Sequence, residues 1–253
     1  MDRRTLGIGL AWLLLLPTPV LAGDGDGILK ALFDDDGWTR LKRRDRGGVA
    51  VYRKDLPGHD QAAYRGVKVM DVDPDVLCDA IFDVGNYKGL SDKIPLKASE
   101  VIAKTRTTVD FWQFLDVPSW SMAKDRFWFA RLTVQRDVGG QEGRHRQSWR
   151  IIDAEQHPEH LAKARAINDK AILAPLNYGG WDIRPLPDGR VELTFVVLSD
   201  PGGRLPKSAE RLSTARTLPE NLLQFEAEAK RRQGSGGGGS PPTAAAPEAP
   251  EDP

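Results

Sequence analysis

The chain has 253 residues, with 36 basic and 36 acidic side chains and a formal net charge of zero. That balance argues against a nucleic-acid-binding protein, which carries a strong excess of Lys and Arg. Cys78 is the single cysteine of the sequence, so an intrachain disulfide is excluded.

Residues 1–22 have the pattern of a secretory signal peptide. Arg3 and Arg4 form a basic start, an apolar stretch runs from Leu6 to Leu16, and Ala22 closes a small-residue cleavage site. The apolar stretch is shorter than the roughly 20 residues that a membrane-spanning helix needs. We therefore expect cleavage after Ala22 and a mature protein that is periplasmic or secreted.

The other end of the sequence also lacks the composition of a folded domain. Residues 234–240 are Gly and Ser, and residues 241–253 are rich in Pro, Ala and Glu without a large apolar side chain. Such segments cannot bury enough apolar area to fold. The expected organisation is one folded domain at 23–233 and a disordered tail at 234–253.

The predicted elements of the domain begin with a short helix at 27–33 and three strands at 38–44, 49–55 and 63–70. A helix at 73–82 follows, because Asp73 is a good N-cap and Pro74 suits a first turn. Cys78 on that helix is expected to be a buried structural thiol. A shorter helical turn is predicted at 87–90.

Six further strands are predicted after that turn, and short turns separate most of them. Their ranges are 98–104, 107–115, 126–138, 144–153, 176–186 and 191–199. Consecutive strands with short turns indicate an antiparallel meander rather than strand–helix–strand crossovers. The basic connection at 154–171 is open to two interpretations, a solvated surface helix or a segment that gates ligand entry or contacts an anionic membrane.

The last strand leads through a tight turn into a long helix. Apolar and polar residues alternate from Val191 to Val197, as in a strand with one buried face. Pro201 and two following glycines force a reversal. The helix that follows, to about Arg232, carries an apolar stripe at helical spacing. Pro219 lies inside it and predicts a kink or a local break near Thr217.

This strand–turn–helix junction resembles the carboxyl-terminal signature of the START (steroidogenic-acute-regulatory-related lipid transfer) family. Further similarities follow the family's order along the chain, at Val51-Tyr-Arg53, Tyr64-Arg-Gly-Val67, Val72-Asp-Pro-Asp-Val76, Lys124-Asp-Arg-Phe127, Arg131 and Tyr178-Gly-Gly-Trp-Asp-Ile183. The resemblance implies an α+β helix-grip fold, in which a curved antiparallel sheet wraps around a long C-terminal helix and encloses a hydrophobic tunnel.

The same resemblance implies a function in lipid binding and in lipid transfer between membranes. The expected partners are a lipid or sterol-like ligand and a transiently contacted membrane, with no nucleic acid, and the protein is expected to act as a monomer. The alternative left open is a cyclase or aromatase-like enzyme on the same scaffold, acting on a hydrophobic polyketide-type substrate.

Arg131 matches the arginine that lies inside the tunnel of family members. Phe127, Phe129 and Arg131 alternate along one strand and share a face, so we favour an inward orientation. The other interpretation places Arg131 at a strand edge with its guanidinium in water. Gln113 stands where the family often has an acid. The remaining candidates for the tunnel wall are Phe111, Phe129, Trp149, Trp181, Phe195, Leu212 and Leu222, each of which is equally compatible with an ordinary core.

Motifs of catalysis are missing from the sequence. It contains no Gly-x-Ser-x-Gly, no His-Glu-x-x-His and no phosphate-binding loop. His157 and His160 flank Pro158 and are expected to be a solvated pair, because a zinc site needs three or four ligands. We therefore expect no catalytic residues, no bound metal and no cofactor, and a protein that is not an enzyme.

Overall fold

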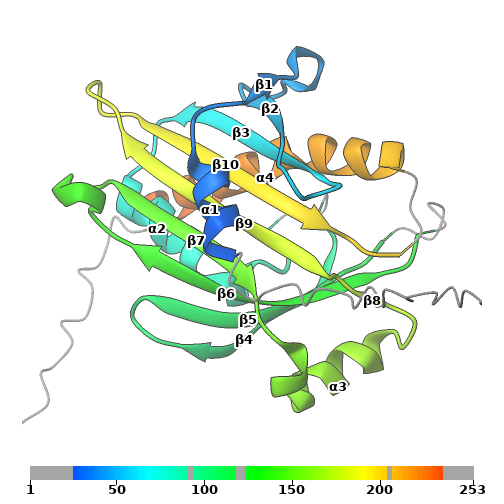
Figure 1. Cartoon of the computed structure of the whole chain (residues 1–253). Coiled ribbons are helices and arrows are strands. Elements are labelled where there is room, and N and C mark those ends of the chain that lie inside the picture. Colours follow the sequence, from blue (N-terminus) through cyan, green and yellow to red (C-terminus); the bar gives the residue numbers. More distant parts are fainter. Residues whose placement is uncertain (1–24, 91–93, 118–122, 204–206, 236–253) are drawn as a thin grey trace, which may run out of the picture.

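The computed structural model describes residues 25–90, 94–117, 123–203 and 207–235, and side chains 207–216 lie outside that description (Figure 1). The predicted signal peptide and most of the predicted tail lie outside the described residues. Both therefore remain predictions.

A ten-stranded sheet forms the body of the described chain. From one edge to the other the strands are β1 (Thr39–Arg40), β2 (Ala50–Asp55), β3 (Ala62–Met70), β10 (Val191–Asp200), β9 (Leu176–Pro185), β7 (His145–Ile151), β6 (Arg126–Gln135), β5 (Thr108–Leu115) and β4 (Leu96–Lys104). Neighbours along this path are antiparallel, and the short β8 (Ile172–Leu173) pairs in parallel with β6. The predicted meander is confirmed from β4 to β10.

The helices cover both faces of the sheet. They are α1 (Gly25–Phe33), α2 (Pro74–Phe82), α3 (Pro158–Ile167) and α4 (Lys207–Ser235), with 3-10 turns η1 (Lys42–Arg44), η2 (Val84–Asn86), η4 (Val138–Gly140) and η5 (Ala154–Gln156). We call the sheet face that packs against α2 and α4 the inner face, and the face that packs against α1 and α3 the outer face. Figure 1 shows α1 and α4 on opposite sides of the sheet. The predicted helix-grip arrangement of an antiparallel sheet and a long C-terminal helix is confirmed, and the hydrophobic tunnel stays a prediction.

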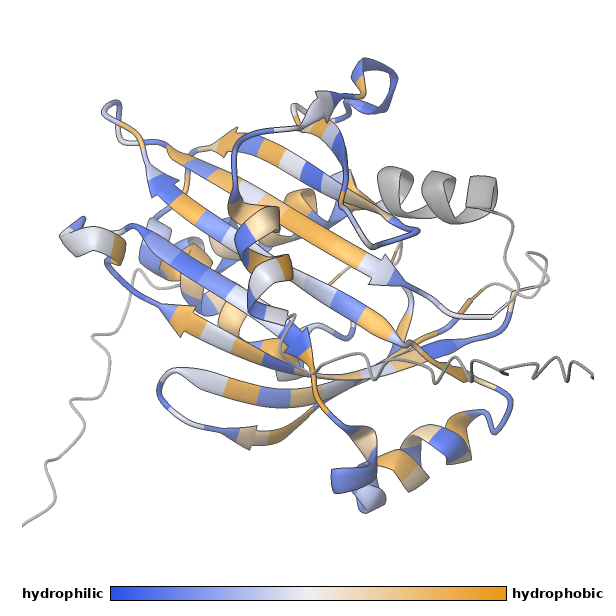
Figure 2. Ribbon diagram, in the orientation of Figure 1, coloured by the Kyte–Doolittle hydropathy of each residue, from blue (hydrophilic) through white to orange (hydrophobic). Residues whose placement is uncertain are grey.

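Apolar residues alternate with polar ones along the strands in Figure 2, and the buried ones form a large core beneath α4. Leu218, Leu222 and Phe225 bring the middle of α4 into this core. Gly66 on β3 permits their close approach, because a Cβ there would lie 2.2 Å from a methyl of Leu218. On the outer face, a Cβ at Gly180 would lie 2.3 Å from the Phe33 ring of α1. Glycines thus allow a helix to pack closely on each face.

The first internal helix, α2, begins as predicted. Asp73 Oδ1 accepts hydrogen bonds from the backbone N–H groups of Asp75 and Val76, at 2.8 and 3.0 Å. Cys78 is fully buried on this helix, and desolvation raises the pKa of its thiol to about 11. The prediction of a buried structural thiol is confirmed.

Two predictions of local structure need correction, and one open question is answered. The strand expected at 38–44 is β1 followed by η1, because the Asp45 carboxylate accepts from Val51 N–H and holds a turn there. For the connection at 154–171, the interpretation as a surface helix is confirmed, since the segment contains η5 and α3. Pro219 lies inside α4, which is assigned as one continuous helix without the expected break.

Candidate ligand-binding site

An aromatic cluster lines the inner face beneath α4. The Trp181 and Phe195 rings, on neighbouring strands, are 4.3 Å apart between centroids, and Trp149 lies 5.7 Å from Phe195. Phe225 of α4 contacts the Trp181 ring edge-on at 5.1 Å and meets Tyr87 at the same distance. These contacts join the centre of the sheet to the last helix through flat apolar surfaces.

Trp149 contributes a hydrogen-bond donor to this cluster as well as an apolar ring. Its side chain is half-buried, and its indole Nε1–H donates to Asn177 Oδ1 at 3.1 Å. Gly179 on β9 makes room for the ring, because a Cβ there would lie 2.2 Å from Trp149 Cζ2. The Gly-Gly-Trp segment of β9 therefore determines how Trp149 lies on the inner face.

Two consecutive hydrogen bonds link β5, β4 and η2 at one edge of the sheet, on its inner face. Gln113 of β5 donates from Nε2 to Ser99 Oγ of β4 at 2.9 Å, and the Ser99 hydroxyl donates to the Val84 carbonyl at 2.7 Å. Gln113 and Ser99 are each only 6% exposed. Because Phe111 lies two residues before Gln113 on the same strand, both side chains lie on the inner face.

Arg131 lies on the outer face, so its predicted inward orientation is wrong. Its guanidinium binds Asp110 in a bidentate pair, with Nε–Oδ1 and Nη2–Oδ2 distances of 2.6 and 2.7 Å. The hydrogen bond to Asp110 raises the pKa of Arg131. The Arg131 side chain is 45% exposed. This agrees better with the other interpretation, in which the guanidinium stays in water. Its cross-strand neighbour is Asp110, whereas Gln113 faces Trp128.

Phe129 also lies on the outer face and belongs to a separate cluster. Its ring stacks with those of Trp112 and His157, at centroid distances of 6.3 and 6.1 Å. Ala164 of α3 belongs to the same cluster. Alternation grouped Phe127, Phe129 and Arg131 correctly, but on the face away from α4. Phe129 is therefore withdrawn as a candidate for the ligand site.

Most of the other predicted site residues lie on one side of the sheet. The structure brings six of them together on the inner face or on the side of α4 that packs against it: Phe111, Gln113, Trp149, Trp181, Phe195 and Leu222. Leu212 belongs to α4, but its side chain lies outside the described residues.

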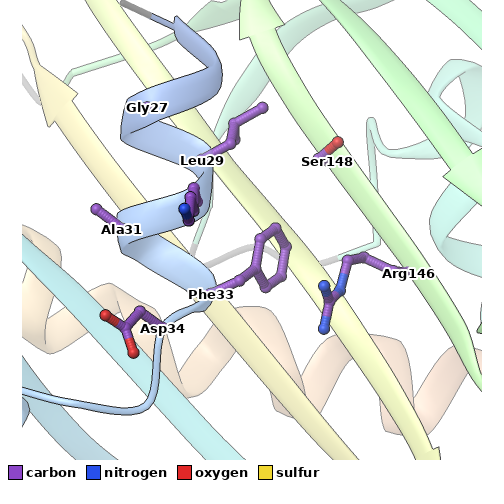
Figure 3. Close-up of a pocket in the computed structure, with 8 residues that line it drawn as sticks. Gly27, Leu29, Ala31, Phe33, Asp34, Arg146 and Ser148 are labelled. Carbon is purple, nitrogen blue, oxygen red and sulfur yellow. The ribbon is translucent and has the colours of Figure 1, made fainter.

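A surface groove lies on the outer face, between α1 and β7 (Figure 3). It has a volume of about 650 Å³ and is lined by Gly27, Leu29, Lys30, Ala31, Phe33, Asp34, Arg146 and Ser148. Arg146 lies over the Phe33 ring at 4.4 Å and forms an ion pair with Asp182 at 3.0 Å. The sheet separates this groove from the aromatic cluster. Among the described helices, none is both long enough and apolar enough to cross a membrane.

Comparison with known proteins identifies the fold. No family model matches the chain. An uncharacterized protein of Pseudomonas aeruginosa is 28% identical over 195 residues, which cover 76% of this chain and 86% of that protein. The STAR-related lipid transfer protein from Xanthomonas axonopodis superposes with a TM-score of 0.62 at 19% identity, over 77% of this chain and 99% of that chain. Human StAR-related lipid transfer protein 5 gives a TM-score of 0.67 at 17% identity, covering 82% and 93%. The chain has the START fold.

Within this START fold, Arg126 is an inner-face residue that the sequence analysis did not select. It pairs with Leu115 at the end of β6 and is 5% exposed. Its Nε and Nη2 donate to the carbonyls of Pro201 and Gly202, both at 3.2 Å, and Nη1 donates to Lys124 O. Desolvation lowers its pKa. Arg126 thus ties the turn before α4 to the sheet. The alternation of residues from 126 to 134 predicts which side of the strand Arg126 occupies. It does not predict the hydrogen-bond partners 75 and 76 residues away.

Proposed function

We propose that this protein is a START-family carrier, which binds a lipid or another large hydrophobic ligand between α4 and the inner face of the sheet. The observation that carries the proposal is the aromatic surface formed by Trp149, Trp181 and Phe195, on the same sheet face as the polar Gln113–Ser99 pair. Flat apolar walls with a few placed polar groups are typical of ligand sites. Burying roughly 300 Å² of apolar ligand surface would contribute about 7 kcal/mol before entropic losses.

The proposed activity is sequestration or transfer of the ligand across an aqueous compartment, with transient contact to a membrane. The signal-peptide pattern at residues 1–22 supports a periplasmic or secreted location. The fold shared with lipid transfer proteins from a bacterium and from human supports a hydrophobic ligand.

Two arginines bear on the cyclase or aromatase-like alternative. That enzyme would need a free arginine in the cavity to steer a reactive polyketone. Arg131 is bound to Asp110 on the outer face, and Arg126 donates to three backbone carbonyls. Neither arrangement favours the enzyme, so a binding protein that performs no chemistry is the better supported proposal.

The test combines ligand identification with a transfer assay. The mature chain is purified from its own cell under native conditions, and co-purifying lipids are extracted and identified by mass spectrometry. Movement of a fluorescent phospholipid from donor to acceptor vesicles is then measured with the wild type and with Trp149→Ala. Loss of one aromatic wall should slow transfer, whereas Lys163→Ala on the outer face should not. A protein that co-purifies with no lipid and accelerates no transfer contradicts the proposal.

A further inference from the structure

The Gln113–Ser99–Val84 hydrogen bonds have one permitted direction. A backbone carbonyl only accepts, so the single hydroxyl proton of Ser99 is committed to Val84 O at 2.7 Å. Ser99 Oγ must then act as acceptor toward Gln113, at 2.9 Å. The amide NH₂ of Gln113 therefore faces Ser99. The orientation of an amide is assigned from its partners, and here the partners leave one choice.

This direction determines what Gln113 offers to a ligand. Among the described residues, the bond to Ser99 is the one hydrogen bond of the Gln113 side chain. With the NH₂ group turned to Ser99, the amide oxygen Oε1 is left as the acceptor for another partner. The side chain lies on the inner face next to Phe111 and opposite Trp128 in register, both within or against the core beneath α4.

Among the described residues, two cations of the inner face, Arg126 and Lys68, are held by protein groups. Arg126 donates to three carbonyls, and Lys68 binds Gly47 O at 2.8 Å and Glu226 at 3.3 Å. An anionic head group would have to displace these partners or remain unpaired in an apolar environment, which is costly.

We infer that the site selects a lipid with an uncharged hydrogen-bond donor, such as a hydroxyl, over one with a carboxylate, and that Gln113 Oε1 accepts that hydrogen bond. A carboxylate presents only acceptors and repels the amide oxygen, whereas a hydroxyl donates to it. The inference rests on the proposed ligand site and names its substrate class. Ser99 acts as a positioning residue, because it holds the amide in this orientation.

The test uses oleyl alcohol and oleate, which share one hydrocarbon chain and differ in the head group. Each compound is titrated, below its own aggregation concentration, into the purified mature protein with bound Nile red at pH 8. The loss of Nile red fluorescence measures the affinity of the compound. We expect the alcohol to bind about tenfold more tightly than oleate, from one hydrogen bond gained and one repulsion avoided. Equal or tighter binding of oleate overturns the inference but leaves a lipid carrier. If neither compound nor Nile red binds, the proposed function itself fails.

Two variants test the mechanism of selection. Ser99→Ala frees the amide to rotate and present its NH₂, so the preference for the alcohol should fall to about twofold, mainly through tighter oleate binding. The fold should persist, because Val84 O keeps its bond from Tyr87 N–H at 3.2 Å. Gln113→Leu should weaken alcohol binding about fivefold and should bind oleate somewhat more tightly than the wild type does, because it removes both the acceptor and the repulsion.

The matched control is Glu100→Gln. Glu100 follows Ser99 on the same strand but pairs with Lys163 of α3, at 3.0 Å. It should leave the alcohol-to-oleate ratio unchanged. Melting curves of all variants establish that they fold. A ratio that stays at the wild-type value in folded Ser99→Ala and folded Gln113→Leu overturns the role of the amide.

Discussion

Gly179→Ala tests whether the fit between β9 and Trp149 holds the inner face together. A Cβ at this position would lie 2.2 Å from Trp149 Cζ2 and 2.4 Å from the Val196 carbonyl oxygen. The indole can rotate away, but the backbone carbonyl cannot move without separating β9 from β10. Gly179 has no positive φ, so the effect comes from contacts and not from backbone strain.

The magnitude follows from two opposing effects. Overpacking in a core costs about 1–3 kcal/mol, and the fixed carbonyl places this case near the upper end. Replacing Gly in a strand returns about 0.5–1 kcal/mol of backbone entropy. The net loss of about 2 kcal/mol should lower the melting temperature by about 4–8 °C in a domain of this size.

The assay is a thermal melt of the purified protein combined with tryptophan fluorescence, which reports the displaced indole. Gly85→Ala is the control for adding a methyl group, since Gly85 has no positive φ and a Cβ there would lie 3.5 Å from the nearest side-chain atom, an ordinary contact. In the double variant Trp149→Ala with Gly179→Ala, the contact with Val196 remains, so the rescue should be partial. A melting temperature for Gly179→Ala within 1–2 °C of the wild type, on the scale expected for ~0.5 kcal/mol, would refute the reasoning.

Three further predictions address the charged residues and the tail. Arg131→Leu should lower stability by about 1–3 kcal/mol, because buried Asp110 loses its partner, while lipid affinity in a titration stays at the wild-type value; a large loss of affinity would return Arg131 to the ligand site. Hydrogen bonds from Arg231 lower the pKa of Glu228 to about 2. Since the unfolded carboxyl titrates near pH ~4.3, this stabilisation is complete above that pH and is lost as the pH falls toward 2, at most about 3 kcal/mol. Glu228→Gln should flatten the acid limb of stability against pH, and an unchanged limb would contradict the assignment. Deleting residues 236–253 should leave the melting temperature unchanged, because their Gly-, Ser-, Pro- and Ala-rich composition buries little apolar area; a drop of several degrees would show that the tail packs on the domain.

Much of the architecture is determined by local pattern. Alternation from Val191 to Val197 and the turn at Pro201–Gly203 specify the last strand and the start of α4, and the structure has both. Asp73 and Pro74 define the start of α2 through the cap that the helix needs. These features depend on neighbours in sequence, so the sequence alone predicts them.

The faces of β6 are a different case. Phe127 and Phe129 read as core residues, and so do Ala130 and Leu132, because α3 covers one face and α4 the other. Period-two alternation separates the two sets but cannot tell which set meets α4. The position of Arg131 was therefore decided only when the helices packed.

The polar side of the site depended on tertiary structure in the same way. Gln113 could be selected from the sequence, but its direction comes from Ser99 on the neighbouring strand and Val84 in η2, 14 and 15 residues apart in successive steps. Arg126 received its carbonyl partners from a turn 75 and 76 residues away. Residue types and periodicity determine which elements form, whereas hydrogen-bond direction and the face a side chain occupies depend on which elements pack against one another.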